Sequence, residues 1–336
     1  MLGQPSIRAA ALAVWLLAAG ASQAQLFKDP ALQALYAADR HDALAQAGSQ
    51  RLATRADDAQ AVLALATAAM ALDDARRREA AIARAEACVQ QAPQAAECHY
   101  ALGTVLATQA MSQGMMAMAR HAGRVKDALT EAVRLDAAWY PARSAAVEFF
   151  VLAPGVMGGS TRRAEELARA AARPEQARAL QARIALGDDQ TDKALALLQD
   201  TPSGGDPALA EDLWKWQAQA GFVLLQSGQA AKARPVFERV LREQPGQAMG
   251  AFGLGRVAQE AGQHAEAVKL FEQGLRAQGA VHYPGLHYRL GLSLQALGQA
   301  DAAKAALQRF VADGRASGKA LDDARKRLAQ LGAPAG

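Results

Sequence analysis

Small and hydrophobic residues recur at the spacing of amphipathic helices, and in the last third of the chain one set of intervals occurs three times. Counted from Gly221, a glycine follows after 7 residues, an alanine after 12 and a phenylalanine after 16, at Gly228, Ala233 and Phe237. The intervals start again 34 residues later at Gly255 and a further 36 residues later at Gly291. Their other members are Gly262, Ala267 and Phe271, then Gly298, Ala303 and Leu307. This pattern predicts three consecutive helix–turn–helix units of about 34 residues each.

Each interval has a physical reason in a pair of closely packed helices. Gly221 has no side chain, so two helices can approach each other closely at this position. Gly228 is expected to end the first helix, where a residue with positive φ is often needed. Ala233 is expected to face the first helix at the crossing, with Phe237 filling the space beside it. Pro245 is expected to stop the second helix, because proline cannot continue it.

A helix pair with this spacing resembles the tetratricopeptide repeat, whose Leu-Gly signature is present at Leu254-Gly255 and Leu290-Gly291. Two departures from the family occur, since Gly279 replaces a closing proline and two residues are inserted before the third unit. The resemblance implies an all-α fold, a right-handed superhelical solenoid of about eight tetratricopeptide-type helix pairs with a C-terminal capping helix. It also implies that the first helices line a concave surface that binds partners.

The N-terminal half repeats the pattern more loosely. Leu102-Gly103 opens another unit, but the second glycine is absent and about ten extra residues follow, which longer paired helices would absorb. We expect divergent helical repeats over residues 25–200, a linker over 201–207, and a C-terminal array with its capping helix over 208–336. Because the linker reads Thr-Pro-Ser-Gly-Gly-Asp-Pro, we expect proteases to cut there first and residues 208–336 to fold alone.

The composition favours helices and disfavours several functions. The chain of 336 residues contains 86 alanines and no asparagine, and only 5% of its residues are aromatic. Alanine is the strongest helix former and strand-favouring residues are scarce, which disfavours a sandwich, a barrel or a large mixed sheet. A formal net charge of +4 is too weak to indicate nucleic-acid binding or a polybasic membrane patch.

Residues 1–24 have the features of a secretory signal peptide. Arg8 precedes an apolar run of about 11 residues, and Ser22-Gln23-Ala24 fits a cleavage site. A retained membrane anchor is the alternative, although a spanning helix needs about 20 apolar residues. Residue 25 is Gln rather than Cys, which excludes lipidation of a new N-terminal cysteine. With no later apolar stretch long enough to span a bilayer, we expect a soluble protein without a transmembrane anchor in a bacterial periplasm.

The chain has two cysteines, Cys88 and Cys98. Cys88 falls late in a predicted second helix that closes near Pro93, and Cys98 falls early in the next first helix. Antiparallel helices joined by a short turn can bring such positions within disulfide range, and an oxidising compartment permits the bond. We therefore predict a disulfide between them. Two cysteines without suitably spaced histidines make a poor zinc site.

The repeat register places a set of positions on the first helices of the three C-terminal pairs. They combine aromatic, Met and Arg side chains with uncharged polar ones, as interaction surfaces do. The predicted groove residues are Lys215, Phe222, Gln226, Met249, Phe252, Arg256, Gln259, Glu260, Tyr288, Leu292 and Gln295. Packing between repeats is the alternative explanation for about half of them. We expect Phe252, Arg256 and Tyr288 to converge; an asparagine-based clamp for a C-terminal carboxylate is not implied.

A glycine-rich turn before a predicted helix allows two explanations. It can form an anion or ligand site from glycines, a helix N-terminus and two arginines, and these residues are Gly158, Gly159, Ser160, Thr161, Arg162 and Arg163. The alternative, which we favour, is a wide turn in which Ser160 or Thr161 caps the helix. The segment lacks the Lys-Ser/Thr pairing of a phosphate-binding P-loop.

Two further groups of side chains raise a metal-binding hypothesis. The first is Met111, Met115, Met116 and Met118, close to His121. Thioethers select Cu(I), but Met side chains also fill helix interfaces and line partner-binding surfaces, and we favour the latter explanations. The second group is His282 and His287, which lack a nearby acid or cysteine to complete a site. We therefore predict neither a metal nor a cofactor.

These features predict a non-catalytic exported scaffold or adaptor that binds a protein or peptide of the cell envelope in its concave groove. The alternative is a small-ligand-binding accessory protein for periplasmic solute uptake, with a pocket near the Met-rich helices and the glycine-rich turn. An enzyme is disfavoured because the sequence shows neither a Ser-His-Asp nor a Cys-His signature. Paired carboxylates such as Asp73-Asp74 fall at predicted helix starts, where capping explains them.

Overall fold

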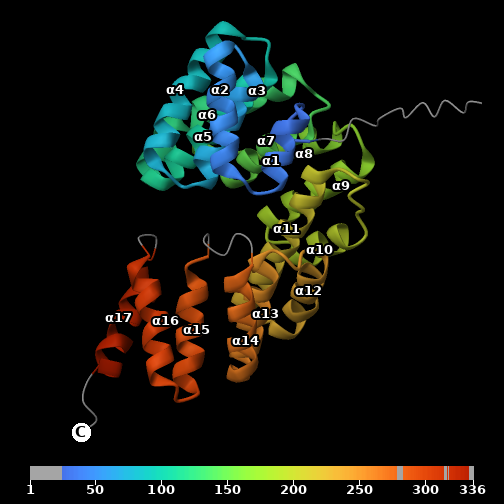
Figure 1. Ribbon diagram of the computed structural model, residues 1–336. Coiled ribbons are helices and arrows are strands. Elements are labelled where there is room, and N and C mark those ends of the chain that lie inside the picture. The colour runs from blue at the N-terminus through green and yellow to red at the C-terminus, as the bar shows by residue number, and fades with distance from the viewer. Residues whose placement is uncertain (1–24, 278–282, 314–315, 317, 333–336) are drawn as a thin grey trace, which may run out of the picture.

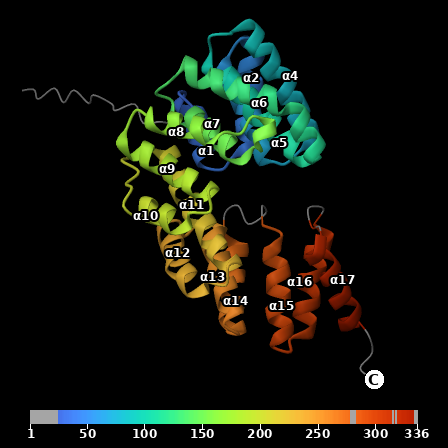
Figure 2. The same cartoon turned by 180° about the vertical axis from the view of Figure 1, so that it is seen from behind.

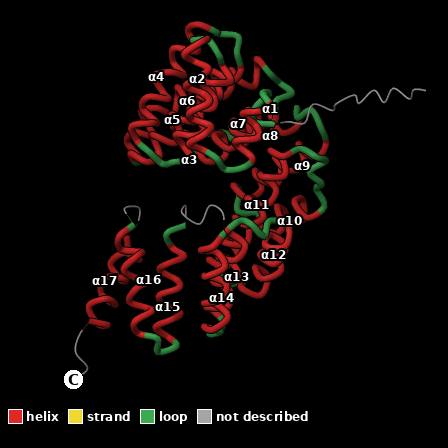
Figure 3. Tube along the Cα trace, in the orientation of Figure 1, coloured by secondary structure: helices red, strands yellow, loops and turns green. Residues whose placement is uncertain are grey.

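The computed structural model describes residues 25–277, 283–313, 316 and 318–332, and this part of the chain consists of helices and loops without strands (Figure 3). The predicted signal peptide and His282 lie outside the described residues. The elements are α1 (Pro30–Ala37), α2 (His41–Thr54), α3 (Ala59–Ala71), α4 (Ala75–Gln91), α5 (Ala96–Gln113), α6 (Met115–Leu135), α7 (Tyr140–Leu152), the 3-10 turn η1 (Gly155–Met157), α8 (Thr161–Arg169), α9 (Pro174–Gly187), α10 (Thr191–Gln199), α11 (Pro207–Gln226), α12 (Ala230–Glu243), α13 (Ala248–Glu260), α14 (His264–Arg276), α15 (Gly285–Ala296), α16 (Ala300–Ala312) and α17 (Gly318–Gly332).

In the described part, the helices form eight consecutive pairs, from α1 with α2 to α15 with α16, and α17 packs on α16 (Figure 1). First helices of neighbouring pairs also touch, as α3 does with α5, α7 with α9, α9 with α11 and α11 with α13. Both views show α2–α6 gathered in one block, α12–α17 in a second row, and α7–α11 connecting them (Figure 2). The predicted all-α solenoid of about eight helix pairs with a terminal helix is confirmed.

The close approach within the C-terminal pairs depends on the predicted glycines. A Cβ atom placed on Gly221 would lie 2.7 Å from the Phe237 ring, and one on Gly255 would lie 2.4 Å from the Phe271 ring. Gly228 ends its turn with a φ of 71°, which glycine adopts without steric cost. Phe237 is fully buried, so the aromatic ring occupies the space that the missing side chains leave. The physical explanation of the intervals is therefore confirmed.

The Met-rich insertion is absorbed by two long helices, α5 with 18 residues and α6 with 21, joined at Gly114. Met111 and Met115 are each 63% exposed and Met116 is 79% exposed, at the end of this helix pair. Core packing is therefore the wrong explanation for these three side chains. Within the described residues, no group of three or more His, Cys, Asp or Glu side chains is arranged to hold a metal ion.

Helix α11 is shared between two hydrophobic cores. Its N-terminal half contributes Leu209 and Trp216 to a core with α7–α10, whereas Leu224 packs with Phe237 in the next core. Asp206 is buried and caps α11 by accepting a hydrogen bond from the Leu209 backbone N–H at 3.1 Å. Gln176 Nε2 also donates to Asp206, at 3.0 Å, so the end of segment 201–207 is fixed to α9. The division at 201–207 and the independent folding of 208–336 stay predictions, and a fragment starting at residue 208 would lose these contacts.

Residues 25–28 are anchored to the body of the protein. Phe27 is fully buried, and the Trp139 indole N–H donates to the Gln25 backbone oxygen at 3.0 Å. The Lys28 ammonium pairs with Glu97 at 2.9 Å and with Asp136 at 3.0 Å. The described chain thus begins in ordered contacts at residue 25. None of the described helices is long and apolar enough for a membrane span.

The predicted disulfide is present between Cys88 near the end of α4 and Cys98 near the start of α5. The Cα atoms are 5.5 Å apart and both side chains are buried in the N-terminal core. The turn between the two helices is short, which is why neighbouring positions in antiparallel helices meet there. The bond closes a loop of 10 residues in the unfolded chain.

We expect replacement of both cysteines by alanine to lower the free energy of unfolding by about 2–3 kcal/mol, because the bond restricts the unfolded chain. Denaturant unfolding of the variant and of the wild type, with and without dithiothreitol, measures this loss. Reduction of the wild type should shift its unfolding midpoint as the double substitution does. An unchanged midpoint after complete reduction would contradict the stabilising role of the bond.

Candidate functional site

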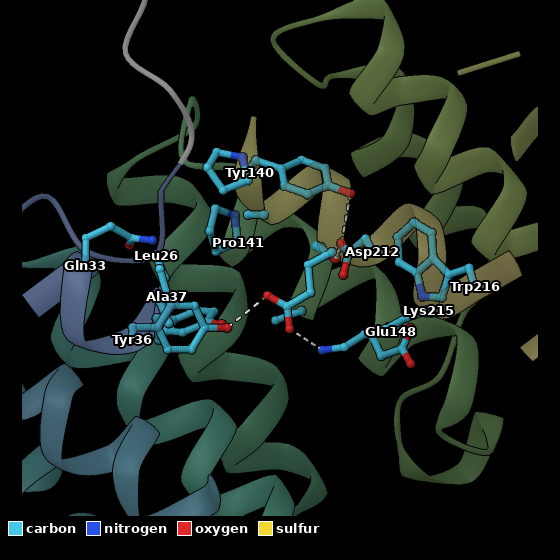
Figure 4. A pocket seen from close by; sticks show the side chains of 16 residues that line it. Leu26, Gln33, Tyr36, Ala37, Tyr140, Pro141, Glu148, Asp212, Lys215 and Trp216 are labelled. Atoms are coloured by element: carbon cyan, nitrogen blue, oxygen red, sulfur yellow. Dashed lines mark hydrogen bonds and ion pairs between the residues drawn. The ribbon is translucent and has the colours of Figure 1, made fainter. Parts of the chain in front are cut away.

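A cavity of about 430 Å³ lies where the N-terminal helices meet α11 (Figure 4). Four helices supply its walls: α1, α5, α7 and α11. Aromatic rings and carboxylates dominate the lining, which includes Tyr36, Tyr100, Tyr140, Ser144, Glu148, Glu211, Asp212, Lys215 and Trp216. Its volume lies in the range of small-molecule sites, which are about 300–1,000 Å³.

Helical spacing places the polar groups of the cavity side by side. Tyr140 and Ser144 are four residues apart on α7, so they lie one above the other on one face. Glu211 and Lys215 have the same spacing on α11 and form an ion pair. Asp212 follows Glu211 directly, which directs the two carboxylates to neighbouring parts of the cavity wall.

Each of the two acids receives hydroxyl donors from another helix. The Tyr36 hydroxyl of α1 donates to Glu211 Oε2 at 3.0 Å. The Tyr140 hydroxyl donates to Asp212 Oδ2 at 2.9 Å, and the Ser144 hydroxyl donates to the same oxygen at 2.5 Å. In Figure 4, Tyr36 and Lys215 both contact one carboxylate, which is that of Glu211. Tyr140 contacts the carboxylate of Asp212.

Burial dominates the electrostatics of the Asp212 side chain. Burial raises its pKa to about 6, although the hydrogen bonds from Ser144 and Tyr140 favour the ionised form. Burial and the neighbouring Asp212 carboxylate also raise the pKa of Tyr140 well above its usual value, so this phenol stays protonated as a donor. At neutral pH the cavity therefore holds an ionised carboxylate that the protein stabilises incompletely.

Part of the predicted C-terminal groove forms a row of aromatic rings. The ring centroids of Phe222 and Phe252 are 5.8 Å apart, and those of Phe252 and Tyr283 are 6.3 Å apart. The Arg256 guanidinium carbon lies 5.8 Å from the Phe222 ring centroid, and Arg256 also pairs with Glu260 at 3.5 Å. The structure thus brings together Phe222, Phe252 and Arg256, all three of which are among the predicted groove residues.

Tyr288 does not join this row, so the predicted convergence of three residues is wrong. Its ring packs on Phe310 with centroids 5.2 Å apart, and its hydroxyl donates to Asp323 Oδ2 at 2.8 Å. Tyr288 therefore connects α15 with α16 and α17. Tyr283, which was not among the predicted groove residues, lies beside Phe252, two residues before the start of α15.

The remaining predicted groove residues divide between packing and exposure. Gln259 Nε2 donates to Ser293 Oγ at 2.8 Å, which ties α13 to α15. Gln295 accepts from Arg327 at 2.8 Å, and Met249 packs against the core that contains Phe237. Leu292 is half-buried, whereas Gln226 and Glu260 are exposed. Lys215 lies at the cavity described above rather than in the aromatic row.

In the glycine-rich turn, the capping explanation is the one that the contacts support. Ser160 Oγ accepts from the Arg163 backbone N–H at 3.3 Å, and Thr161 begins α8. Arg163 pairs with Glu166 at 2.8 Å, and Arg162 lies 4.0 Å from the same carboxylate. Gly158 has a φ of 96°, and a Cβ atom on Gly159 would lie 1.7 Å from the Ala153 oxygen. An anion at this turn stays a prediction.

Among the residues that line the cavity, only Lys215 was a predicted site residue. The carboxylates of Glu211 and Asp212 meet hydroxyls of Tyr36 and Tyr140, from positions 175 and 72 residues earlier in the chain. No interval within a repeat relates such positions. The one local signal is the Glu211-Asp212 pair, which together with Lys215 interrupts the apolar residues between Leu209 and Trp216.

Two segments of the chain match models of the tetratricopeptide repeat, residues 224–280 and residues 286–313. No curated protein matches the chain in sequence. Among solved structures, the APC/C hetero-tetramer Cut9-Hcn1 contains a similar chain, with a TM-score of 0.55 and 12% identity over 90% of this chain and 48% of that one. The human IFIT1 dimer with m7Gppp-AAAA is similar too, with a TM-score of 0.55 and 17% identity over 81% of this chain and 62% of that one. This chain spans less than two thirds of each, and the likeness shows the fold.

We expect Asp212→Asn to raise the free energy of unfolding by roughly 1–3 kcal/mol at pH 7.5, because the amide keeps the hydroxyl contacts without the buried charge. The folded-state pKa of about 6 lies above the ordinary value of 3.8, so the stability that a protonated Asp212 contributes is lost as the pH rises through 6. The difference between variant and wild type should therefore vanish near pH 4.

Denaturant unfolding between pH 4 and pH 8 measures this difference. The titratable groups that share the cavity with Asp212 and the Ser144 hydroxyl that donates to it are unchanged in the variant; the titratable groups are Tyr36, Tyr100, Tyr140, Glu148, Glu211 and Lys215. Asp301→Asn, at an exposed position of α16, is the matched control. A variant that is less stable than the wild type at every pH would show that the Asp212 charge is well compensated.

Proposed function

We propose that this protein is a non-catalytic periplasmic scaffold that binds an extended segment of a cell-envelope protein along the surface formed by α11, α13 and α15. The tetratricopeptide matches support a protein-interaction scaffold, since they cover α13, α15 and the end of α11. A non-catalytic role is proposed because helical repeat arrays act through the surfaces that their stacked pairs present.

The observation that carries this proposal is the Arg256 side chain beside the aromatic row. Its Nε is buried and has no hydrogen-bond partner in the described structure. Burial and the nearby Arg289 lower the pKa of Arg256, so an added acceptor or negative charge would stabilise the guanidinium. Arg and aromatic side chains contribute a large share of the binding energy of interfaces. A partner segment with a carboxylate next to an apolar side chain fits these features.

Two features support the periplasmic location within the proposal. Residues 1–24 have the sequence pattern of a cleaved signal peptide. The disulfide between Cys88 and Cys98 fits an oxidising compartment, where such bonds persist. Detection of the mature chain beginning at Gln25 in a periplasmic extract would test the location.

A second candidate function is a small-ligand-binding accessory protein for periplasmic solute uptake. The observation that favours it is the cavity of about 430 Å³ bounded by α1, α5, α7 and α11. This cavity lies apart from the Met-rich end and the glycine-rich turn, where the alternative hypothesis from the sequence placed a ligand pocket.

We expect a photo-crosslinking residue at Gln226, an exposed position of α11, to capture one discrete partner in the source periplasm. A synthetic peptide of the captured segment should bind the purified protein, and Arg256→Ala should weaken its affinity at least tenfold, about 1.4 kcal/mol. Arg276→Ala, at an exposed position on the second helix α14, is the matched control and should leave the affinity unchanged.

Circular dichroism and thermal melting should show that the Arg256→Ala variant keeps its helical structure. Equal affinity of the peptide for the wild type and for Arg256→Ala would exclude the aromatic row as the binding surface. Capture by a crosslinking residue at Arg276 but not at Gln226 would place the partner on the second helices instead.

A further inference from the structure

We propose that the cavity between α1, α7 and α11 binds a primary ammonium group, with the Asp212 carboxylate as its counterion. This inference does not depend on the partner surface around Arg256, which lies on other residues. The ligand would supply the positive charge that no side chain within 4.0 Å provides to Asp212 in the described part of the chain.

The neighbouring Glu211 carboxylate has both a tyrosine hydroxyl and an ammonium group as partners, and a bound amine would give Asp212 the same pair. Glu211 accepts a hydrogen bond from the Tyr36 hydroxyl and also pairs with the Lys215 ammonium. Asp212 likewise accepts from a tyrosine hydroxyl, that of Tyr140, but it has no ion-pair partner within 4.0 Å among the described residues. Asp212 has a second hydroxyl donor, Ser144, where Glu211 has the ammonium of Lys215.

The free oxygen of Asp212 has room for this cation. Both hydroxyl donors, from Tyr140 and Ser144, bind Oδ2, so Oδ1 has no hydrogen-bond donor among the described residues. An ionised carboxylate accepts several hydrogen bonds, and a buried charge without a counterion is costly. Asp212 lines the cavity, and an ammonium there would supply N–H donors and positive charge together.

The other charged side chains at the cavity already have ion-pair partners, so a cation beside Asp212 would have to come from a ligand. Glu148 pairs with Arg183, and Lys215 is engaged by Glu211. Of the three lining carboxylates, Asp212 alone has no cation within 4.0 Å in the described part of the chain, although the Lys215 charge also acts on it from a greater distance. The net charge of the pocket therefore favours a cationic ligand over an anionic one.

The apolar part of the cavity fits the carbon chain of an amine. Tyr36, Tyr100, Tyr140 and Trp216 supply aromatic walls, and aromatic rings attract cations as well as burying alkyl chains. A primary ammonium has three N–H donors for the carboxylate, whereas a quaternary ammonium has none. The chemistry selects an alkyl primary amine, which can come from a free diamine or from a lysine side chain.

Isothermal titration calorimetry on the full mature chain at pH 7.5 tests this inference. The probes are 1,5-diaminopentane, Nα-acetyl-lysine methylamide and tetramethylammonium. We expect saturable binding of at least one primary amine with a dissociation constant below about 1 mM, and much weaker binding of tetramethylammonium. Preference for the diamine would identify a free amine as the source, and preference for the lysine derivative would identify a protein side chain.

Substitutions distinguish a direct contact between Asp212 and the amine from a general effect of the protein's net charge on amine binding. Asp212→Asn should weaken amine binding at least tenfold while the protein remains folded, and Ser144→Ala should weaken it a few-fold. Asp301→Asn, which removes an exposed charge on α16, should not change it. Absence of saturable amine binding by the wild type, or equal binding by Asp212→Asn, would overturn the inference. None of the three substitutions should change crosslinking at Gln226, so failure of one proposal is distinguishable from failure of the other.

Discussion

The burial of α11 on both sides is the packing constraint on which the rest of the structure depends. Leu209 and Trp216 fill the core formed with α7–α10, and Leu224 fills the core closed by Phe237. Asp206 fixes the start of the helix through its cap and its contact with Gln176. Because one rigid helix belongs to both cores, the looser N-terminal pairs and the regular C-terminal pairs are held as one continuous array.

The same constraint produces the cavity and determines its chemistry. The face of α11 that turns toward α1 and α7 carries Glu211 and Asp212, and the packing of the helix leaves both residues only partly exposed to water. Hydroxyl groups of Tyr36 and Tyr140 replace part of the lost hydration. The hydrogen bonds offset this burial only in part for Asp212, whose pKa stays raised. A carboxylate retained at such a cost is typical of sites that bind a ligand.

The repeat architecture was readable from the sequence because its determinants are local. Gly221 and Phe237 are 16 residues apart, and Cys88 and Cys98 are 10 apart, so intervals along the chain predict their contacts. The cavity could not be predicted from the sequence, because the Tyr36–Glu211 contact joins positions 175 residues apart and depends on how six helix pairs stack. Tyr288 was misplaced for a related reason: its partner Asp323 lies on α17, outside the repeat whose register placed it.

Amide hydrogen exchange on the full chain tests the central role of α11 most directly. If α11 joins the two cores, the amides of its N-terminal and C-terminal halves should exchange at similarly slow rates, and far more slowly than those of the terminal helix α17. Opening of the helix would then require the loss of both cores together. Fast exchange of residues 209–216 with slow exchange of residues 218–225 would show that the core formed with α7–α10 separates from α11. This result would contradict the account.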